Sequence, residues 1–190
     1  PPGVLSITPA NRSELNSISE ITAVLEDNSG TGLDFTSTGS NIQVIGPDGT
    51  EVEGTTSHEG DNLILGINLA TDGSEDGRYT VSVKPVDNTG TAGNEKRVTF
   101  IYDTEQPEII SVTNIDMTAN VSLVNGEISR IEAVLVDAMP PSGYADNAGI
   151  DFETSTVRLK SSDGNIVDGE QGDNDTDKIW WQLSNPLSRG

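Results

Sequence analysis

The sequence of 190 residues contains no cysteine and a single histidine, His58. Disulfides, thiolate nucleophiles and thiolate metal sites are therefore excluded, and so are His-rich zinc sites. Basic residues are scarce as well, because ten Lys and Arg stand against 31 Asp and Glu, for a formal net charge of −21. This balance argues against a nucleic-acid partner, which needs clustered Lys and Arg. No apolar run has the length of a membrane span, so membrane insertion is not expected.

What the sequence does contain is an internal repeat. The stretch ISEITAVLED at 18–27 returns as ISRIEAVLVD at 128–137, with seven of ten positions identical. Three shorter matches keep the same order along the chain: VLSIT at 4–8 with IISVT at 109–113, LDF at 33–35 with IDF at 150–152, and DG at 48–49 with DG at 163–164. The spacing changes only in loop-like stretches, so the sequence predicts two homologous units of roughly 100 residues each.

The repeat predicts one domain at residues 1–104 and a second at residues 105–190. The connection between them, DTEQP at 103–107, is short and ends in a proline, which stiffens the backbone. We therefore expect the two domains to be held end to end rather than to swing freely.

Alternation of apolar and polar residues predicts strands rather than helices. Tyr79, Val81 and Val83 recur at every second position, and Asp-Gly pairs mark turns at strand spacing. Only the stretch 15–25 also fits a helical stripe, and we interpret it as a strand because Asn125-Gly126 precedes its second copy as a turn precedes a strand. The predicted strands of the first unit are 3–8, 18–26, 41–46, 51–54, 62–69, 78–86 and 97–103.

Seven short strands without a helix in about 100 residues predict an all-β antiparallel sandwich. The run DGRYTVSV at 76–83, followed by VTFIYDTEQP at 98–107, resembles the tandem immunoglobulin-like (Ig-like) repeats of large bacterial secreted and cell-surface proteins. The resemblance implies two tandem Ig-like β-sandwich domains, with Tyr79 at the start of a strand as a tyrosine corner. It also implies a role as stalk, spacer or adhesive unit.

The second unit departs from this pattern near residue 190. Ile179, Trp181 and Leu183 match a strand of the first unit at 62–69, but the two strands predicted at 78–86 and 97–103 have no counterpart. The second domain therefore reads as a sandwich that lacks its last two strands. The sequence predicts that the remainder of a longer polypeptide, or a complementing chain, completes it.

Acidic residues predict a calcium site, because carboxylate and carbonyl oxygens are the ligands that calcium prefers. The alternation of loops in an Ig-like sandwich should bring several acids to the domain junction. The alternative is a solvated acidic surface whose repulsion is screened by salt. The candidate ligands are Asp72, Asp76, Asp103, Glu105, Asp173, Asp175 and Asp177.

Trp180 is the candidate ligand-binding aromatic, because in a strand it would point away from the core side chain Trp181 and could stack on a sugar. The alternative is that a neighbouring loop or strand covers it. Ser57-His58 lies in a predicted polar loop, and nothing in the sequence marks an aligned base or an oxyanion hole, so no enzyme is expected.

These observations favour a non-catalytic structural or adhesion module of a larger bacterial surface or secreted protein, extracellular or at the cell surface. The alternative is a carbohydrate-binding or accessory module of a secreted hydrolase, for which Trp180 would supply the aromatic platform.

Overall fold

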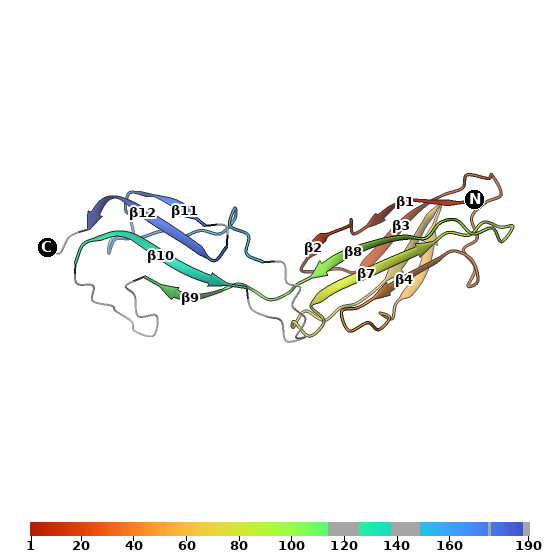
Figure 1. The fold of residues 1–190 in the computed structure, drawn as a ribbon, viewed down its shortest axis with the longest axis horizontal. Helices are drawn as coiled ribbons and strands as arrows, with labels where there is room; N and C mark the ends of the chain where they lie inside the picture. Colours follow the sequence, from red (N-terminus) through yellow and green to blue (C-terminus); the bar gives the residue numbers. More distant parts are fainter. Residues whose placement is uncertain (114–125, 138–148, 175, 188–190) are drawn as a thin grey trace. The chain divides into compact units, whose positions relative to one another are not determined.

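The computed structural model describes residues 1–113, 126–137, 149–174 and 176–187. These residues form strands, turns and irregular segments without a helix (Figure 1). The described chain thus offers no helix of the length and apolarity that crossing a membrane requires. It divides into two compact units, the first ending at Glu105 and the second beginning at Gln106.

The first sheet of the first unit has four antiparallel strands. They are β1 (Gly3–Thr8), β3 (Glu20–Glu26), β5 (Thr55–Glu59) and β6 (Asn62–Gly66), in the order β1-β3-β6-β5. The stretch with a helical alternative is therefore strand β3, with Ile21, Ala23 and Leu25 all buried on one face. The pairing confirms the period-two interpretation of this stretch, because β1 pairs with one edge of β3 and β6 with the other.

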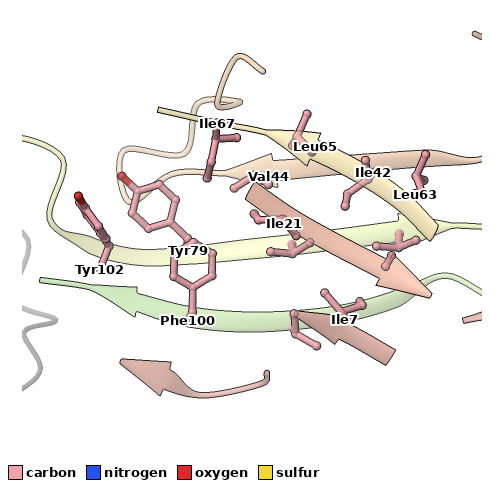
Figure 2. Close-up of a cluster of buried hydrophobic side chains, with 14 of the residues drawn as sticks. Ile7, Ile21, Ile42, Val44, Leu63, Leu65, Ile67, Tyr79, Phe100 and Tyr102 are labelled. Atoms are coloured by element: carbon pink, nitrogen blue, oxygen red, sulfur yellow. The ribbon is translucent and has the colours of Figure 1, made fainter. Parts of the chain in front are cut away.

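The second sheet holds β2 (Ser13–Leu15), β4 (Asn41–Ile45), β7 (Gly77–Lys84) and β8 (Lys96–Tyr102), in the order β2-β8-β7-β4. The β4–β7 and β7–β8 pairs are antiparallel, whereas β2 runs parallel to β8. The apolar faces of the two sheets enclose one core (Figure 2), in which Tyr79, Val81 and Phe100 of the second sheet meet Ile21 and Leu65 of the first. The first unit is therefore an Ig-like β-sandwich, as the sequence predicts.

The second unit repeats the first sheet. Its strands are β9 (Glu108–Val112), β10 (Ile128–Val136), β11 (Gly169–Asp173) and β12 (Lys178–Leu187), in the order β11-β12-β10-β9. The register is the same in both units. Ile21 pairs with Leu65 in the first, and their sequence counterparts Ile131 and Trp181 pair in the second.

Two edge strands depart from the predictions. The strand expected at 51–54 lies instead at 55–59, and residue 51 makes only an isolated bridge to Ile45. His58 is therefore in strand β5 rather than in a loop, and its ring stacks on Phe35 with centroids 4.3 Å apart. The candidate ligand Asp173, expected in a loop, likewise ends a strand, β11. All five side chains of β5 are exposed, so it carries no apolar alternation by which it could be predicted.

Candidate functional site

Tyr79 fixes the loop between β6 and β7 of the first unit. Its hydroxyl donates a hydrogen bond to the Glu75 carbonyl, 2.5 Å away and four residues upstream, which is the contact of a tyrosine corner. The ring stacks on Phe100 with centroids 5.1 Å apart and meets Tyr102 edge-on at 6.3 Å. Burial, and then the nearby Glu75 carboxylate, raise the pKa of the Tyr79 hydroxyl above its usual range. The hydroxyl therefore stays protonated and remains a donor at physiological pH.

Asp76 fastens the chain where it leaves the first unit. Its fully buried carboxylate accepts hydrogen bonds from the Thr104 backbone N–H at 2.8 Å and from the Thr104 hydroxyl at 2.9 Å. The same hydroxyl accepts the Gly73 N–H at 3.1 Å, and the Asp103 carboxylate accepts the Glu105 N–H at 3.1 Å. We call Gly73, Asp76 and Thr104 the exit clamp. It ties the residues after β8 to the loop before β7.

Strand β2 lies beside the same exit. Its parallel ladder joins Ser13 to Phe100 and Leu15 to Tyr102. The Arg12 N–H donates to the Thr99 carbonyl at 2.6 Å and the Asp103 N–H to the Leu15 carbonyl at 2.8 Å, so the ladder continues before the start of β2 and beyond the end of β8. This strand has three residues and no apolar alternation, and the sequence gives no signal for it.

Four of the candidate calcium ligands, Asp72, Asp76, Asp103 and Asp177, already accept hydrogen bonds within their own units. The Asp72 carboxylate accepts the Ser74 hydroxyl at 2.5 Å and the Ser74 N–H at 3.1 Å, and these bonds lower its pKa. In the second unit, Asp173 ends β11 and the Asp177 carboxylate accepts the Asn174 side-chain amide at 2.8 Å. Asp175 lies outside the described residues. Across the described residues, no three acidic or histidine side chains are grouped as a metal ion would require.

A second acidic network closes the loops at the other end of the first unit. Asp87 is 2% exposed, and its Oδ1 accepts the Thr89 hydroxyl at 2.6 Å and the Thr89 and Thr91 N–H groups at 3.0 and 2.9 Å. Its Oδ2 accepts the Ser29 hydroxyl at 3.2 Å. The Thr89 hydroxyl, followed by the backbone donors, lowers the pKa of Asp87 to about 2. The ionised carboxylate thus organises the loop.

The loops of the second unit repeat bonds of the first. The Asp27 carboxylate accepts the Gly32 N–H at 2.8 Å, and its counterpart Asp137 accepts the Gly149 N–H at 2.7 Å. Gly49 and Gly164 take the same left-handed conformation, with φ of 81° and 85°, in two matching turns. The two turns form from local sequence, whereas the carboxylate bond spans 5 residues in the first unit and 12 in the second.

Trp180 and Trp181 point to opposite faces of β12. Trp180 is half-buried, and the Arg130 guanidinium lies 4.5 Å from its ring centroid. Glu132 pairs with both Arg130 and Lys178 on the same face, and these two contacts lower its pKa. Trp181 is also half-buried, and its Nε1 donates to the Val167 carbonyl at 3.0 Å. One face of the Trp180 ring is thus occupied by a cation.

No protein-family model and no curated protein sequence matches the chain. Among solved structures, the filamin domain of Lin-41 is 26% identical, with a TM-score of 0.33 over 50% of this chain and 89% of that one. A DUF4785 family protein from Legionella pneumophila is 10% identical, with a TM-score of 0.38 over 68% of this chain and 34% of that one. BcpA, the major pilin subunit of Bacillus cereus, is 13% identical, with a TM-score of 0.20 over 98% of this chain and 65% of that one.

The chain thus spans about a third of the Legionella protein and just under two thirds of the pilin. At these low TM-scores the likenesses add nothing to the Ig-like fold, which rests on the strand order and register described above.

Proposed function

We propose that this chain is a force-bearing spacer or adhesion module, non-catalytic and located outside the cell or at its surface, in a larger bacterial surface or secreted protein. The observation that carries the proposal is the parallel ladder between β2 and β8. The N-terminus lies at one end of the first unit and β8 leaves at the other (Figure 1). Tension between these ends pulls β2 and β8 along their common axis in opposite directions.

A parallel pair loaded in this way is sheared. Its hydrogen bonds must break together, whereas an antiparallel hairpin pulled from its open end breaks them one at a time. The bonds of Arg12 and Asp103 extend the ladder, and the exit clamp holds Thr104 to Asp76 directly beyond it. The cysteine-free composition and the many carboxylates suit an exported, soluble module.

Single-molecule pulling on the full chain, held at its two ends, tests this proposal. Glu14→Pro removes a backbone N–H from β2 and should lower the force at which the first unit unfolds. The matched control is Ser57→Pro in the edge strand β5, which lies outside the loaded pair and should lower the thermal midpoint without lowering that force. Equal unfolding forces for Glu14→Pro and the unaltered chain would refute the force-bearing role.

A further inference from the structure

Strand β5 forms one edge of the first sheet of the first unit. The sheet order is β1-β3-β6-β5, and among the described residues no strand pairs with β5 on the side away from β6. Many edge strands are blocked by lysine, proline or a β-bulge, whereas β5 has the sequence TTSHE and pairs with β6 in an unbroken register. All five of its side chains are exposed. The backbone of β5 therefore presents a regular, accessible edge to a further strand.

The pairing of β6 shows which backbone groups of β5 point outward. The Leu25 N–H of β3 donates to the Asp61 carbonyl at 2.9 Å, immediately before β6, so the odd-numbered residues of β6 hydrogen-bond to β3. The even-numbered residues of β6 then hydrogen-bond to β5, where they lie opposite Thr55, Ser57 and Glu59. The N–H and C=O groups of Thr56 and His58 consequently point away from β6, to the free edge.

The side chains of Thr56 and His58 lie on the side of the sheet that faces the core. They pair across the strands with Leu65 and Leu63, which are 5% and 2% exposed, and paired residues point to the same face. Thr56 and His58 are nevertheless exposed, because the second sheet ends at β4 in the order β2-β8-β7-β4. In the described chain, the flank of the sandwich between β4 and β5 is therefore open.

A cavity of about 550 Å³ lies in this flank, a volume in the range of ligand sites, which is about 300–1,000 Å³. Ile42 of β4, Thr56 of β5 and Leu65 of β6 line it, together with the segment 51–54. Its charged lining consists of the carboxylates of Glu51 and Glu53, and no basic side chain of the described residues lines it. The cavity therefore favours a cationic partner.

We propose that the first unit binds an extended peptide segment with basic side chains at alternate positions, which pairs antiparallel with the free edge of β5 and extends the first sheet. The edge carries the proposal, because unpaired backbone groups at alternate residues require an extended partner. Glu51 and Glu53 select basic side chains in that partner. The surface is separate from the β2–β8 pair, so the proposal does not depend on the force-bearing role.

The register fixes where the basic side chains of the partner lie. Partner residues directly opposite Thr56 and His58 exchange backbone hydrogen bonds with them. Directly opposite residues share a face of the sheet, so the side chains of these partner residues point toward the cavity and its two carboxylates. The basic residues therefore use their own N–H groups for pairing with β5, and the residues between them leave theirs unpaired.

The test titrates the full 190-residue chain with the synthetic peptide acetyl-KVKVKVK-amide. Hydrogen exchange of the Thr56 and His58 amides is followed by NMR, and calorimetry gives the dissociation constant. We expect exchange of these two amides to slow about 10-fold at a free peptide concentration about ten times that constant, because the bound peptide must dissociate before they exchange.

Two matched peptides keep the charge and change only the backbone. Methylation of every lysine N–H should abolish the protection, because these groups face β5, whereas methylation of every valine N–H should keep it. In the protein, Glu51→Gln with Glu53→Gln should weaken binding about 10-fold, as for the loss of two exposed ion pairs. The control pair Glu20→Gln with Glu26→Gln removes the same charge from β3, which β6 separates from β5, and should leave the dissociation constant unchanged.

Three outcomes would overturn the proposal. In the first, the unmodified peptide slows the exchange of neither Thr56 nor His58. In the second, the peptide methylated at lysine binds as tightly as the unmodified one, which makes charge alone the cause of binding. In the third, these amides already exchange as slowly as that of Ser57 in the free chain, and protection that rises with chain concentration then makes a second copy the occupant of the edge.

Discussion

The two units differ in how completely they bury the same sheet. The main cluster of buried apolar side chains belongs entirely to the first unit, where two sheets enclose it. Of the six large apolar side chains that are exposed in the described chain, only Leu5 lies in the first unit. Yet strand order and register agree between the two sheets. The centre of the second sheet is also buried, at Ile131, Ala133, Ile179 and Leu183. The two units therefore share their register and differ at the margin of the sheet, where Ile109 is exposed.

Two loop contacts, by contrast, recur in both units. Asp27 and Asp137 accept the same backbone bond, and matching glycines make the same turn. The turn joins neighbouring residues, whereas the carboxylate bond joins residues 5 apart in the first unit and 12 apart in the second.

Truncating the same apolar strand position in each unit should give the largest difference in stability loss. Equal losses in the two units would contradict the comparison. Leu25→Ala in the first unit should cost roughly 3–4 kcal/mol of unfolding free energy, and Leu135→Ala at the same strand position roughly 1–2 kcal/mol, because Leu25 is fully buried and Leu135 only partly. Urea denaturation followed by signals assigned to each unit measures both losses. Equal losses would mean that the second unit encloses Leu135 as fully as the first encloses Leu25.

Removing the Tyr79 hydroxyl should have an intermediate effect that is confined to the first unit. Tyr79→Phe keeps the ring stacking on Phe100 and leaves the Glu75 carbonyl without its donor. We expect a loss of about 1–2 kcal/mol in the first unit, as for a buried hydrogen bond left half-made. Thermal unfolding with the second unit as internal reference measures it, and an unchanged midpoint would show that the bond contributes nothing to stability.

Lowering the pH should reduce the stability of the first unit through Asp87, by less than the loss expected for Tyr79→Phe. The folded-state pKa of Asp87 is lowered to about 2, below the ordinary value of about 3.9. The unfolded chain therefore binds more protons between these values. The stability that Asp87 contributes is fully present above about pH 4 and is lost as the pH falls towards 2.

Asp87→Asn should therefore make the stability of the first unit less dependent on pH in this range. Thr89→Val, which removes the hydroxyl bonded to Asp87, should raise the pKa of the carboxyl group. Carboxyl NMR titration reads the pKa directly. A titration of Asp87 near 4 in the unaltered chain would contradict the network described here.

Calcium should have the smallest effect on the comparison. The carboxylates of Asp72, Asp76 and Asp103 already accept hydrogen bonds from Ser74, Thr104 and Glu105, and an ion would have to displace these donors. We expect binding on the order of millimolar, the weak end of the range for extracellular calcium sites. Calorimetric titration of the full chain, with Asp72→Asn as control, measures it. Micromolar affinity that is lost in Asp72→Asn would show that the acids assemble into a real site.

Most of the core strands could be predicted from the sequence because they alternate. Strands β1, β4, β6, β7 and β8 begin within one residue of their predicted starts, and β3 within two. Strands β2 and β5 could not be located, because one has three residues and the other has only exposed side chains. Such a strand is positioned by the partner that offers it a free edge, β8 for one and β6 for the other.

The contacts of the candidate site also differ in whether they could be predicted from the sequence. The tyrosine corner of Tyr79 was predicted through the resemblance to Ig-like repeats, and the hydrogen bond from its hydroxyl to the Glu75 carbonyl, four residues upstream, confirms it. The bonds from Asp76 to Thr104 could not be predicted, because they span 28 residues and depend on two strands arriving side by side. The acids expected to gather around calcium were predicted from their number and loop positions, but which donors satisfy them depends on the folded loops.

By itself, then, the sequence determined the all-β class, the repeat and the local turns, because alternation, Asp-Gly pairs and short-range hydrogen bonds act between neighbouring residues. Only the tertiary structure decided that β2 pairs in parallel with β8, that Asp76 holds the exit of the first unit, and that Ile109 stays exposed where Val4 is packed. The reason is physical. Each of these features depends on which surface lies opposite, and that surface comes from residues far away along the chain.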